Sequence, residues 1–347
     1  MQRTGFVPAN ANDHHEGGPS LGSARVAIQS LVTGGKPPTE GWQARAVPIQ
    51  HSYGKGVAWT SVTPVITGDR VETVLEVPAG GWYRLELKTG ADGLTAASVE
   101  PVGVGDIFLI AGQSYAANTG DEVLSVEDRD GRVSAYDLRN NRWAVANDPF
   151  PPPVGGNGGT PWPPAMNLLM PMARVPIGLV NVSVGGTAVG QWLPGEVLVA
   201  GDIKYYLYKD LVAAGKAMGR FRAVLWQQGE SDVIAKTSAE VYQQRLNTVV
   251  DQSAGEWGFR PVWMLAKSTC HPTVYVRPVE EGVIRGALEQ LSHKPGFAPG
   301  PDTDILCEVG LYRAPLGTRR HFTGAGQRAA GLLWFTALWN ALYTTTK

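Results

Sequence analysis

The sequence predicts an α/β fold, with a flavodoxin-like core on a parallel sheet, preceded by a small antiparallel β-sandwich domain. The main observation is a change of strand pattern near residue 105. Before it, short strands alternate apolar and polar residues, as in sheets with one solvated face. After it, continuously apolar strands alternate with helical patterns, as in doubly wound α/β domains. We therefore expect two domains, residues 1–104 and 105–347, in this chain of 347 residues.

The N-terminal domain shows its strands most clearly at residues 71–77 and 83–87, where apolar side chains alternate with charged ones. Turn-forming residues at 78–81 separate these two runs. Turn signals at intervals of roughly ten residues are typical of a β-sandwich. Residues 1 to about 22 are polar and rich in Gly and Pro, and we expect an extended arm there.

The C-terminal domain alternates apolar strands with helices. Five segments are candidate strands, the last weaker than the others: 106–111, 177–184, 223–226, 262–266 and 304–307. Four segments have helical periodicity: 207–218, 238–251, 280–291 and 324–342. Ser238 and Thr323 stand where N-cap side chains are expected. Residues 118–175 are rich in Pro, Gly and Asn, and we expect a loop insertion that contributes a wall of the site.

Composition excludes several classes of protein. Basic and acidic residues nearly balance, 30 against 31, and no Lys/Arg cluster offers the basic face that nucleic-acid binding requires. No apolar run approaches the ~18 residues of a transmembrane helix. Cys270 and Cys307 are too few for a disulfide scaffold or a structural zinc site, and whether they pair stays open.

The start of the chain and its tryptophan content each leave two alternatives. Residues 1–5 lack the apolar core of a signal peptide, so the protein is either cytoplasmic or lacks a signal that has been removed. The 11 tryptophans are many for this length. They are either core residues or exposed rings of a sugar-binding surface, because an indole face stacks well on a pyranose ring.

Polar groups follow three of the predicted strands and precede the last helix. In chain order they are Gly112-Gln113-Ser114, Gly185-Gly186-Thr187, Gln227-Gln228-Gly229-Glu230-Ser231-Asp232 and Arg320-His321-Phe322-Thr323. In a doubly wound sheet, ligands bind beyond the carboxyl ends of the strands. We therefore expect a serine, a glycine pair, amide and carboxylate groups and a histidine to share one rim of the sheet.

Ser114 and His321 are the candidate reacting pair. A serine hydroxyl becomes a nucleophile when a base accepts its proton, and histidine suits that role at neutral pH. The tetrahedral oxyanion then needs converging donors, here the Ser114 N–H, a glycine N–H and a side-chain amide. Each of these groups is common by itself. The inference of an acyl-transfer site rests on their occurrence, in this order, at the ends of consecutive strands. The other histidines follow no recurring ligand spacing, and no role is assigned to them: His14, His15, His51, His271 and His293.

Four sequence blocks together resemble the SGNH-type hydrolases of the sialate O-acetylesterase and acetylxylan esterase kind. The first is Gly-Gln-Ser at 112–114, and the second is Gly-Gly-Thr at 185–187 followed by Trp192. The third, Trp-Gln-Gln-Gly-Glu-Ser-Asp at 226–232, is the most specific. The fourth is His-Phe-Thr at 321–323 followed by Gly326. The resemblance covers about residues 105–335, and a β domain before the esterase core also occurs among such proteins.

The resemblance implies a role for each block. Ser114 would be the nucleophile and His321 the general base. Gly185 would provide the second oxyanion donor, with Gly186 as the one-residue alternative. Gln228 would provide the third donor, in place of the Asn of other SGNH branches.

Two positions depart from the family pattern. Tyr115 follows the nucleophile, where the family usually has Asn or Asp. Thr318 stands three residues before the histidine, where the family usually has the Asp that orients the imidazole. Three interpretations stay open: a Ser-His dyad with a backbone carbonyl holding the imidazole, an impaired site, or an acid supplied from elsewhere. The candidate acids are Glu230, Asp232, Asp304 and Glu308.

The resemblance implies a carbohydrate O-acetylesterase that removes acetyl groups from a poly- or oligosaccharide and needs no metal or organic cofactor. Glu230 would brace its site, unless that carboxylate pairs with a nearby arginine instead. We expect an acetylated carbohydrate as partner, and neither nucleic acid nor membrane. Polysaccharide esterases are normally exported, which favours a secreted or periplasmic location. The alternatives are a non-catalytic glycan-binding protein on a degenerate esterase fold, and a lipid or thioester hydrolase of the same fold.

Overall fold

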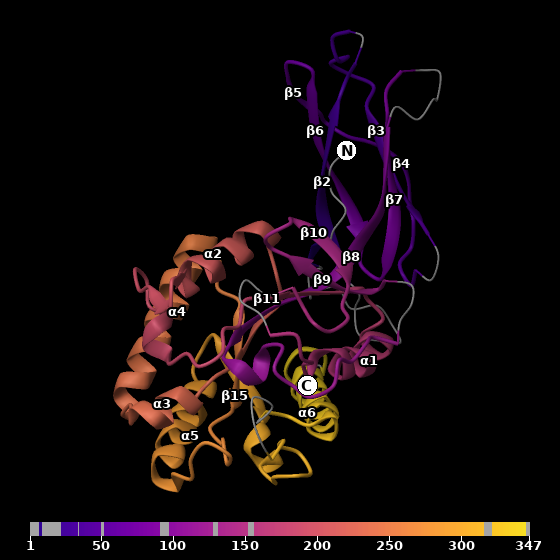
Figure 1. Cartoon of the computed structure of the whole chain (residues 1–347). Coiled ribbons are helices and arrows are strands. Elements are labelled where there is room, and N and C mark those ends of the chain that lie inside the picture. Colours follow the sequence, from indigo (N-terminus) through magenta and orange to yellow (C-terminus); the bar gives the residue numbers. More distant parts are fainter. Residues whose placement is uncertain are drawn as a thin grey trace. The chain divides into compact units, whose positions relative to one another are not determined.

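The computed structural model describes residues 7–8, 22–33, 35–49, 52–90, 97–127, 131–151, 156–315 and 321–344 (Figure 1). The chain divides into two compact units. The first contains residues 1–107, 129–132 and 170–178, and the second contains 108–128, 133–169 and 179–347. The long strand β8 (Ala97–Gly112) begins in the first unit and ends in the second.

The first unit is built from two antiparallel sheets. One has the order β2 (Ser23–Leu31), β6 (Arg70–Pro78), β5 (Val65–Thr67). The other joins β4 (Val57–Ser61), β3 (Gln43–Pro48), β7 (Gly81–Lys88) and the start of β8, and β1 (Val7–Pro8) runs parallel to β8. Alternate residues of β6 are buried, which is the two-residue period expected from the sequence. These sheets confirm the predicted antiparallel β architecture.

The second unit contains a sheet in the order β10 (Arg142–Val145), β9 (Val133–Asp137), β11 (Ile177–Asn181), β8, β14 (Ala223–Gln227), β15 (Val262–Lys267), β16 (Phe297–Asp302). The last five strands follow the flavodoxin-like order, in which the second strand lies beside the first and the third to fifth follow on its other side. Strands β8, β14, β15 and β16 pair in parallel. The sheet is mixed rather than purely parallel, because β9 and β10 pair antiparallel at its edge.

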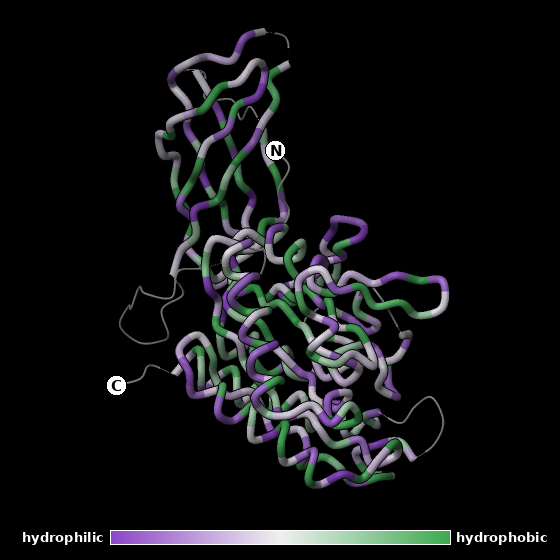
Figure 2. The backbone as a smooth tube through the Cα atoms, turned by 90° about the vertical axis from the view of Figure 1, so that its left-hand side faces the viewer, coloured by the Kyte–Doolittle hydropathy of each residue, from purple (hydrophilic) through white to green (hydrophobic). Residues whose placement is uncertain are grey.

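Helices cover both faces of this sheet (Figure 1). On one side lie α2 (Leu207–Met218), α3 (Glu230–Ala235), α4 (Ala239–Trp257) and α5 (Pro278–Ser292). On the other lie α1 (Trp162–Ala173) and α6 (Gly324–Leu342), where the rings of Trp162 and Trp334 are 5.2 Å apart. Strands β11 and β14 are buried at every position, and the middle of this unit is largely hydrophobic in Figure 2. A small hairpin, β12 (Leu198–Ala200) and β13 (Ile203–Tyr205), completes the strands.

The predicted helices are confirmed, and so are both predicted caps. The Ser238 side chain accepts a hydrogen bond from the Val241 N–H, and the Thr323 side chain accepts one from the Gly326 N–H. Each cap satisfies one of the amide groups that a helix start leaves without a partner.

Two predictions about the core were wrong. Residues 304–307 are not a strand, because Thr303–Leu306 forms the 3-10 helix η3, which the Asp302 side chain caps through the Asp304 N–H. The fifth parallel strand is β16, just before it, and its two prolines and glycine hid the strand pattern. The 118–175 segment is not all loop, since it contains β9, β10 and α1. Pro163 and Pro164 fall in the first turn of α1, where a proline costs no hydrogen bond.

None of the helices in the described part of the chain is long and apolar enough to cross a membrane.

Candidate active site

Ser114 begins the short 3-10 helix η1 (Ser114–Ala116), two residues after β8 ends. Its residue is 6% exposed, and its carbonyl accepts hydrogen bonds from the Ala117 N–H (3.0 Å) and the Thr119 hydroxyl (2.6 Å). Gly112 has φ +136°, and a Cβ there would lie 2.1 Å from the Gln227 carbonyl oxygen. Only glycine therefore allows β8 to run so close to β14 just before the serine turn.

Gly185 lies directly beside the serine. A Cβ built on Gly185 would be 3.6 Å from the Cβ of Ser114, whereas a Cβ on Gly186 would meet nothing within 4 Å. The Val184 N–H donates to the Gly112 carbonyl at 3.0 Å, which holds the two loops together. The glycine block is thus adjacent to the candidate nucleophile, with Gly185 nearer to it than Gly186.

The Thr and Trp of the second block serve the fold. The Trp192 indole N–H donates to the Thr187 hydroxyl at 3.1 Å, and that hydroxyl donates to the Val184 carbonyl at 2.9 Å. Both residues are completely buried. They stabilise the loop that carries Gly185.

Gln228 lies at the carboxyl end of β14, and its side chain is fully buried. Three acceptors lie within hydrogen-bond distance of its two Nε2 hydrogens: the Thr187 carbonyl (3.0 Å), Asp232 Oδ2 (2.6 Å) and Gln113 Oε1 (3.2 Å). Its Oε1 accepts from the Tyr242 hydroxyl at 2.8 Å. The amide therefore has a full set of partners within the protein. Its predicted role as an oxyanion donor stays a prediction, and it requires one of these donors to be released to the substrate.

Gln113 joins the first block to the third. Its Oε1 accepts from the Ser231 N–H at 3.1 Å, the Gly229 N–H at 3.4 Å and Gln228 Nε2. The residue is 2% exposed. The Gln of the Gly-Gln-Ser motif thus anchors the start of α3 against the serine turn.

Glu230, the first residue of α3, is completely enclosed. Its Oε1 accepts from the Ser268 hydroxyl at 2.6 Å, and its Oε2 has no hydrogen-bond partner among the described residues. Burial raises the pKa of Glu230 to about 8, with a smaller contribution from the nearby Asp304 carboxylate. The described residues include no ion pair of Glu230 with an arginine, so that alternative is not observed.

His321 lies one residue before Phe322 and two before the cap of α6. The Ala314 N–H donates to its carbonyl at 2.9 Å. Its ring centroid is 5.2 Å from that of Tyr115 and 5.3 Å from that of His271. Because Tyr115 is the residue after Ser114, the structure brings the predicted base to the serine turn.

Arg313 ties the serine turn to the histidine segment. Its guanidinium carbon lies 4.0 Å from the Tyr115 ring centroid and 4.1 Å from that of Phe322. Arg313 is fully buried and donates to the carbonyls of Leu306 (2.7 Å) and Thr303 (3.2 Å). A cation between two aromatic faces stabilises both rings by about 0.5–2 kcal/mol each.

Of the four candidate acids, the three other than Glu230 are engaged elsewhere or lie at the surface. Asp232 accepts from the Val189 N–H, the Thr237 hydroxyl and Gln228. Asp304 accepts from two backbone N–H groups, one hydroxyl and the guanidinium of Arg285. Glu308 is exposed. Thr318 lies outside the described residues. Within the described part of the chain, no three His, Cys, Asp or Glu side chains form a group that could hold a metal ion.

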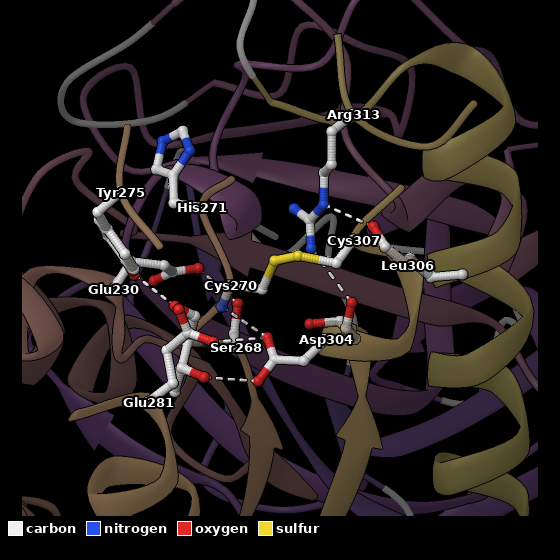
Figure 3. The surroundings of a disulfide bond; sticks show 12 residues. Glu230, Ser268, Cys270, His271, Tyr275, Glu281, Asp304, Leu306, Cys307 and Arg313 are labelled. Carbon is white, nitrogen blue, oxygen red and sulfur yellow. Dashed lines mark hydrogen bonds between the residues drawn. A yellow bond between two sulfur atoms is a disulfide. The ribbon is translucent and has the colours of Figure 1, made fainter. Parts of the chain in front are cut away.

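A disulfide joins Cys270 to Cys307, with their Cα atoms 6.2 Å apart (Figure 3). This settles the pairing that the sequence left open. The bond connects the loop after β15 to the end of η3. Asp304 reinforces the same connection, since it accepts from the Cys270 N–H at 2.9 Å. His271 and Tyr275 lie on one side of the bond and Arg313 on the other.

A cavity of about 380 Å³ is lined by residues between 118 and 158, which follow the serine turn in the chain. Its lining is glycine-rich and both polar and apolar, with Asn118, Thr119, Asp121 and Val123 among the residues at its wall. Thr119 connects it to the site through its hydrogen bond to the Ser114 carbonyl. The 118–175 segment lines this cavity, and its role as a wall of the site stays a prediction.

Comparisons with known proteins agree with this geometry. Residues 104–267 match the sequence model of the family described as "Carbohydrate esterase, sialic acid-specific acetylesterase". An Arabidopsis thaliana protein named "Probable carbohydrate esterase" is 29% identical over 173 residues, which are 43% of this chain and 63% of the plant protein. A carbohydrate acetylesterase from Xanthomonas citri superposes with a TM-score of 0.56 at 16% identity, over 99% of this chain and 74% of that one. The resemblance to the SGNH-type carbohydrate esterases is confirmed.

The matched region includes Ser114, Gly185, Gln228 and Glu230 but ends before His321. The chain spans about 63% of the length of the curated plant relative. The structure also brings to the serine turn a residue that sequence reasoning did not single out, His271. Its signal was available, because it follows the carboxyl end of β15, a strand end that lies on the same rim as the others.

The tryptophans of the chain are mostly core residues. Seven of the 11 are buried: Trp42, Trp82, Trp162, Trp192, Trp226, Trp263 and Trp334. In the esterase region, Trp226 donates its indole N–H to the Tyr242 hydroxyl, which in turn holds Gln228. The tryptophan content therefore reflects packing, and it is no evidence for a sugar-binding surface.

Proposed function

We propose that this protein is a carbohydrate O-acetylesterase that uses Ser114 to form an acetyl-enzyme. The observation that carries the proposal is that a Cβ built on Gly185 would lie 3.6 Å from the Cβ of Ser114, so that the glycine leaves a side-chain-free backbone beside the nucleophile. Further support comes from His321, whose ring lies in contact with the residue that follows the serine. The family match over residues 104–267 supports ester chemistry on a carbohydrate.

In the first half of the reaction, Ser114 Oγ attacks the acetyl carbonyl carbon while His321 takes the hydroxyl proton. The carbonyl oxygen becomes an oxyanion, and the N–H groups of Ser114 and Gly185 donate to it. The tetrahedral intermediate then collapses. The bond to the sugar oxygen breaks, and His321 returns its proton to that oxygen, so the sugar leaves as an alcohol.

In the second half, water replaces the sugar. His321 accepts a proton from the water as its oxygen attacks the acetyl-enzyme carbonyl. The same donors hold the second oxyanion. Collapse breaks the bond to Ser114 Oγ, which takes the proton back, and acetate is released.

The cavity lined by residues between 118 and 158 can accept part of a sugar. Its volume of about 380 Å³ is in the range of small-molecule sites. The side chains of Asn118, Thr119 and Asp121 at its wall can form hydrogen bonds with sugar hydroxyl groups, and Val123 adds an apolar contact.

The test is acetate release from 4-nitrophenyl acetate and from acetylated xylan, measured for wild type, Ser114→Ala and Ser125→Ala. Ser125 is an exposed serine of the same unit and serves as the matched control. We expect Ser114→Ala to lose at least 10³-fold in kcat/KM and Ser125→Ala to equal wild type. Equal activity in all three proteins would reject Ser114 as the nucleophile. No turnover in wild type together with retained glycan binding would support the non-catalytic alternative.

A further inference from the structure

Three rings meet at the serine turn. The centroids of Tyr115 and His271 are 5.4 Å apart, those of Tyr115 and His321 are 5.2 Å apart, and those of His271 and His321 are 5.3 Å apart. Each ring thus contacts both of the others at the distances of favourable aromatic packing. The predicted general base is one corner of this triangle.

Both partners of His321 are themselves firmly supported. His271 follows Cys270, whose disulfide to Cys307 anchors the loop, and the His271 carbonyl accepts the N–H groups of Val274 (2.9 Å) and Tyr275 (3.0 Å). His271 is 7% exposed. Figure 3 shows its ring standing above this loop, on the side away from Ser268 and Asp304.

Tyr115 is also held in place by its neighbours. It is 1% exposed, and the Arg313 guanidinium lies 4.0 Å from its ring centroid. Its hydroxyl is 3.4 Å from His271 Nδ1, which is at the long end of hydrogen-bond distances. Burial raises the pKa of Tyr115, so the phenol stays neutral at any physiological pH. Ring packing rather than this long hydrogen bond therefore dominates the contact.

We propose that His271 is a positioning residue for His321, and that together with Tyr115 it holds the imidazole by ring packing. The residue three positions before His321 is Thr318, which offers no carboxylate to orient the ring. A carboxylate at that position would limit rotation of the His321 imidazole. Packing against the rings of Tyr115 and His271 limits that rotation as well. Correct orientation of a general base matters by orders of magnitude in rate. The inference rests on the esterase function proposed above.

The experiment compares His271→Ala, His271→Phe and the matched control His293→Ala, which makes the same change at an exposed helix end. We expect His271→Ala to lower kcat for 4-nitrophenyl acetate by about 10–100-fold with KM changed less than about threefold. We expect His271→Phe to regain most of that loss, because it restores the ring without an imidazole.

A second measurement is independent of turnover. Side-chain NMR relaxation of histidine-labelled protein reports the order of the His321 ring. It should fall in His271→Ala and recover in His271→Phe, even if wild type proved inactive and the esterase proposal failed. The positioning role would be rejected if His321 stayed equally ordered in His271→Ala, or if His271→Phe were as slow as His271→Ala in an active enzyme.

Discussion

The Cβ that an alanine would place at position 185 lies 3.6 Å from the Cβ of Ser114, an ordinary van der Waals distance. An alanine methyl group at position 185 would therefore reach the serine turn without a clash. The two glycines of the block differ in this respect, because a Cβ on Gly186 would meet nothing within 4 Å and its φ is +72°.

Gly185→Ala should fold normally but lose about 10²-fold in kcat/KM, because its methyl group occupies the approach to the serine and its N–H. Gly186→Ala should instead lose about 1–2 kcal/mol of unfolding free energy, since its backbone is left-handed. Urea unfolding and 4-nitrophenyl acetate hydrolysis measure the two effects. If Gly186→Ala lost activity and Gly185→Ala did not, the oxyanion donor would be Gly186.

The Glu230 carboxyl makes stability depend on pH. Burial raises its pKa from 4.5 to about 8, so the folded protein keeps this proton between those values while the unfolded chain releases it. The unfolding free energy should therefore fall as pH rises from about 5 to 8, by up to about 1.4 kcal/mol per pH unit from this group.

Glu230→Gln removes that dependence and keeps an oxygen that can accept from Ser268. The difference in unfolding free energy, variant minus wild type, should grow with pH in urea titrations at pH 5, 6, 7 and 8. The matched control is Glu127→Gln at an exposed position, for which the difference should not grow. If the unfolding free energies of wild type and Glu230→Gln changed with pH in parallel, that would contradict the raised pKa of Glu230.

The disulfide should contribute strongly to stability. It closes a loop with a sequence separation of 37 residues between Cys270 and Cys307. A loop of that length restricts the unfolded chain by about 3–4 kcal/mol. The double variant Cys270→Ser/Cys307→Ser should lose an amount of that order in urea unfolding. Reduction of the wild-type protein should lower its unfolding free energy by the same amount. If the reductant also destabilised the double variant, the loss in wild type would have a cause other than the disulfide.

Gln113 should matter for stability although it is not a reacting group. Gln113→Leu keeps the size of the side chain but removes the oxygen that accepts from the Ser231 N–H and the Gly229 N–H. Buried donors left without an acceptor cost about 1–3 kcal/mol each. We expect about 2–4 kcal/mol less unfolding free energy, against little change for Gln252→Leu on the exposed face of α4. If the two variants were equally stable, the hydrogen bonds that Gln113 makes between the first and third sequence blocks would not contribute to stability.

The sequence by itself determined the elements whose pattern is local. Helix α2 has the predicted bounds 207–218, and Ser238 and Thr323 cap their helices as expected. Periodicity and capping involve residues within one or two turns of each other, so they can be read from the chain. The same holds for the order of polar groups at strand ends, which predicts Ser114 and Gly185 on one rim of the sheet.

The tertiary structure decided what depends on residues far apart in the chain. Strand β16 exists because β15 pairs with it, although its own sequence reads as turns. The Gln228 side-chain amide lies within hydrogen-bond distance of Thr187 and Gln113, which are 41 and 115 residues away in the chain. No rule of sequence spacing predicts these partners. His271 and His321 are 50 residues apart in the chain, yet their ring centroids lie 5.3 Å apart. Such contacts are set by packing in three dimensions, and packing leaves no periodic trace in the sequence.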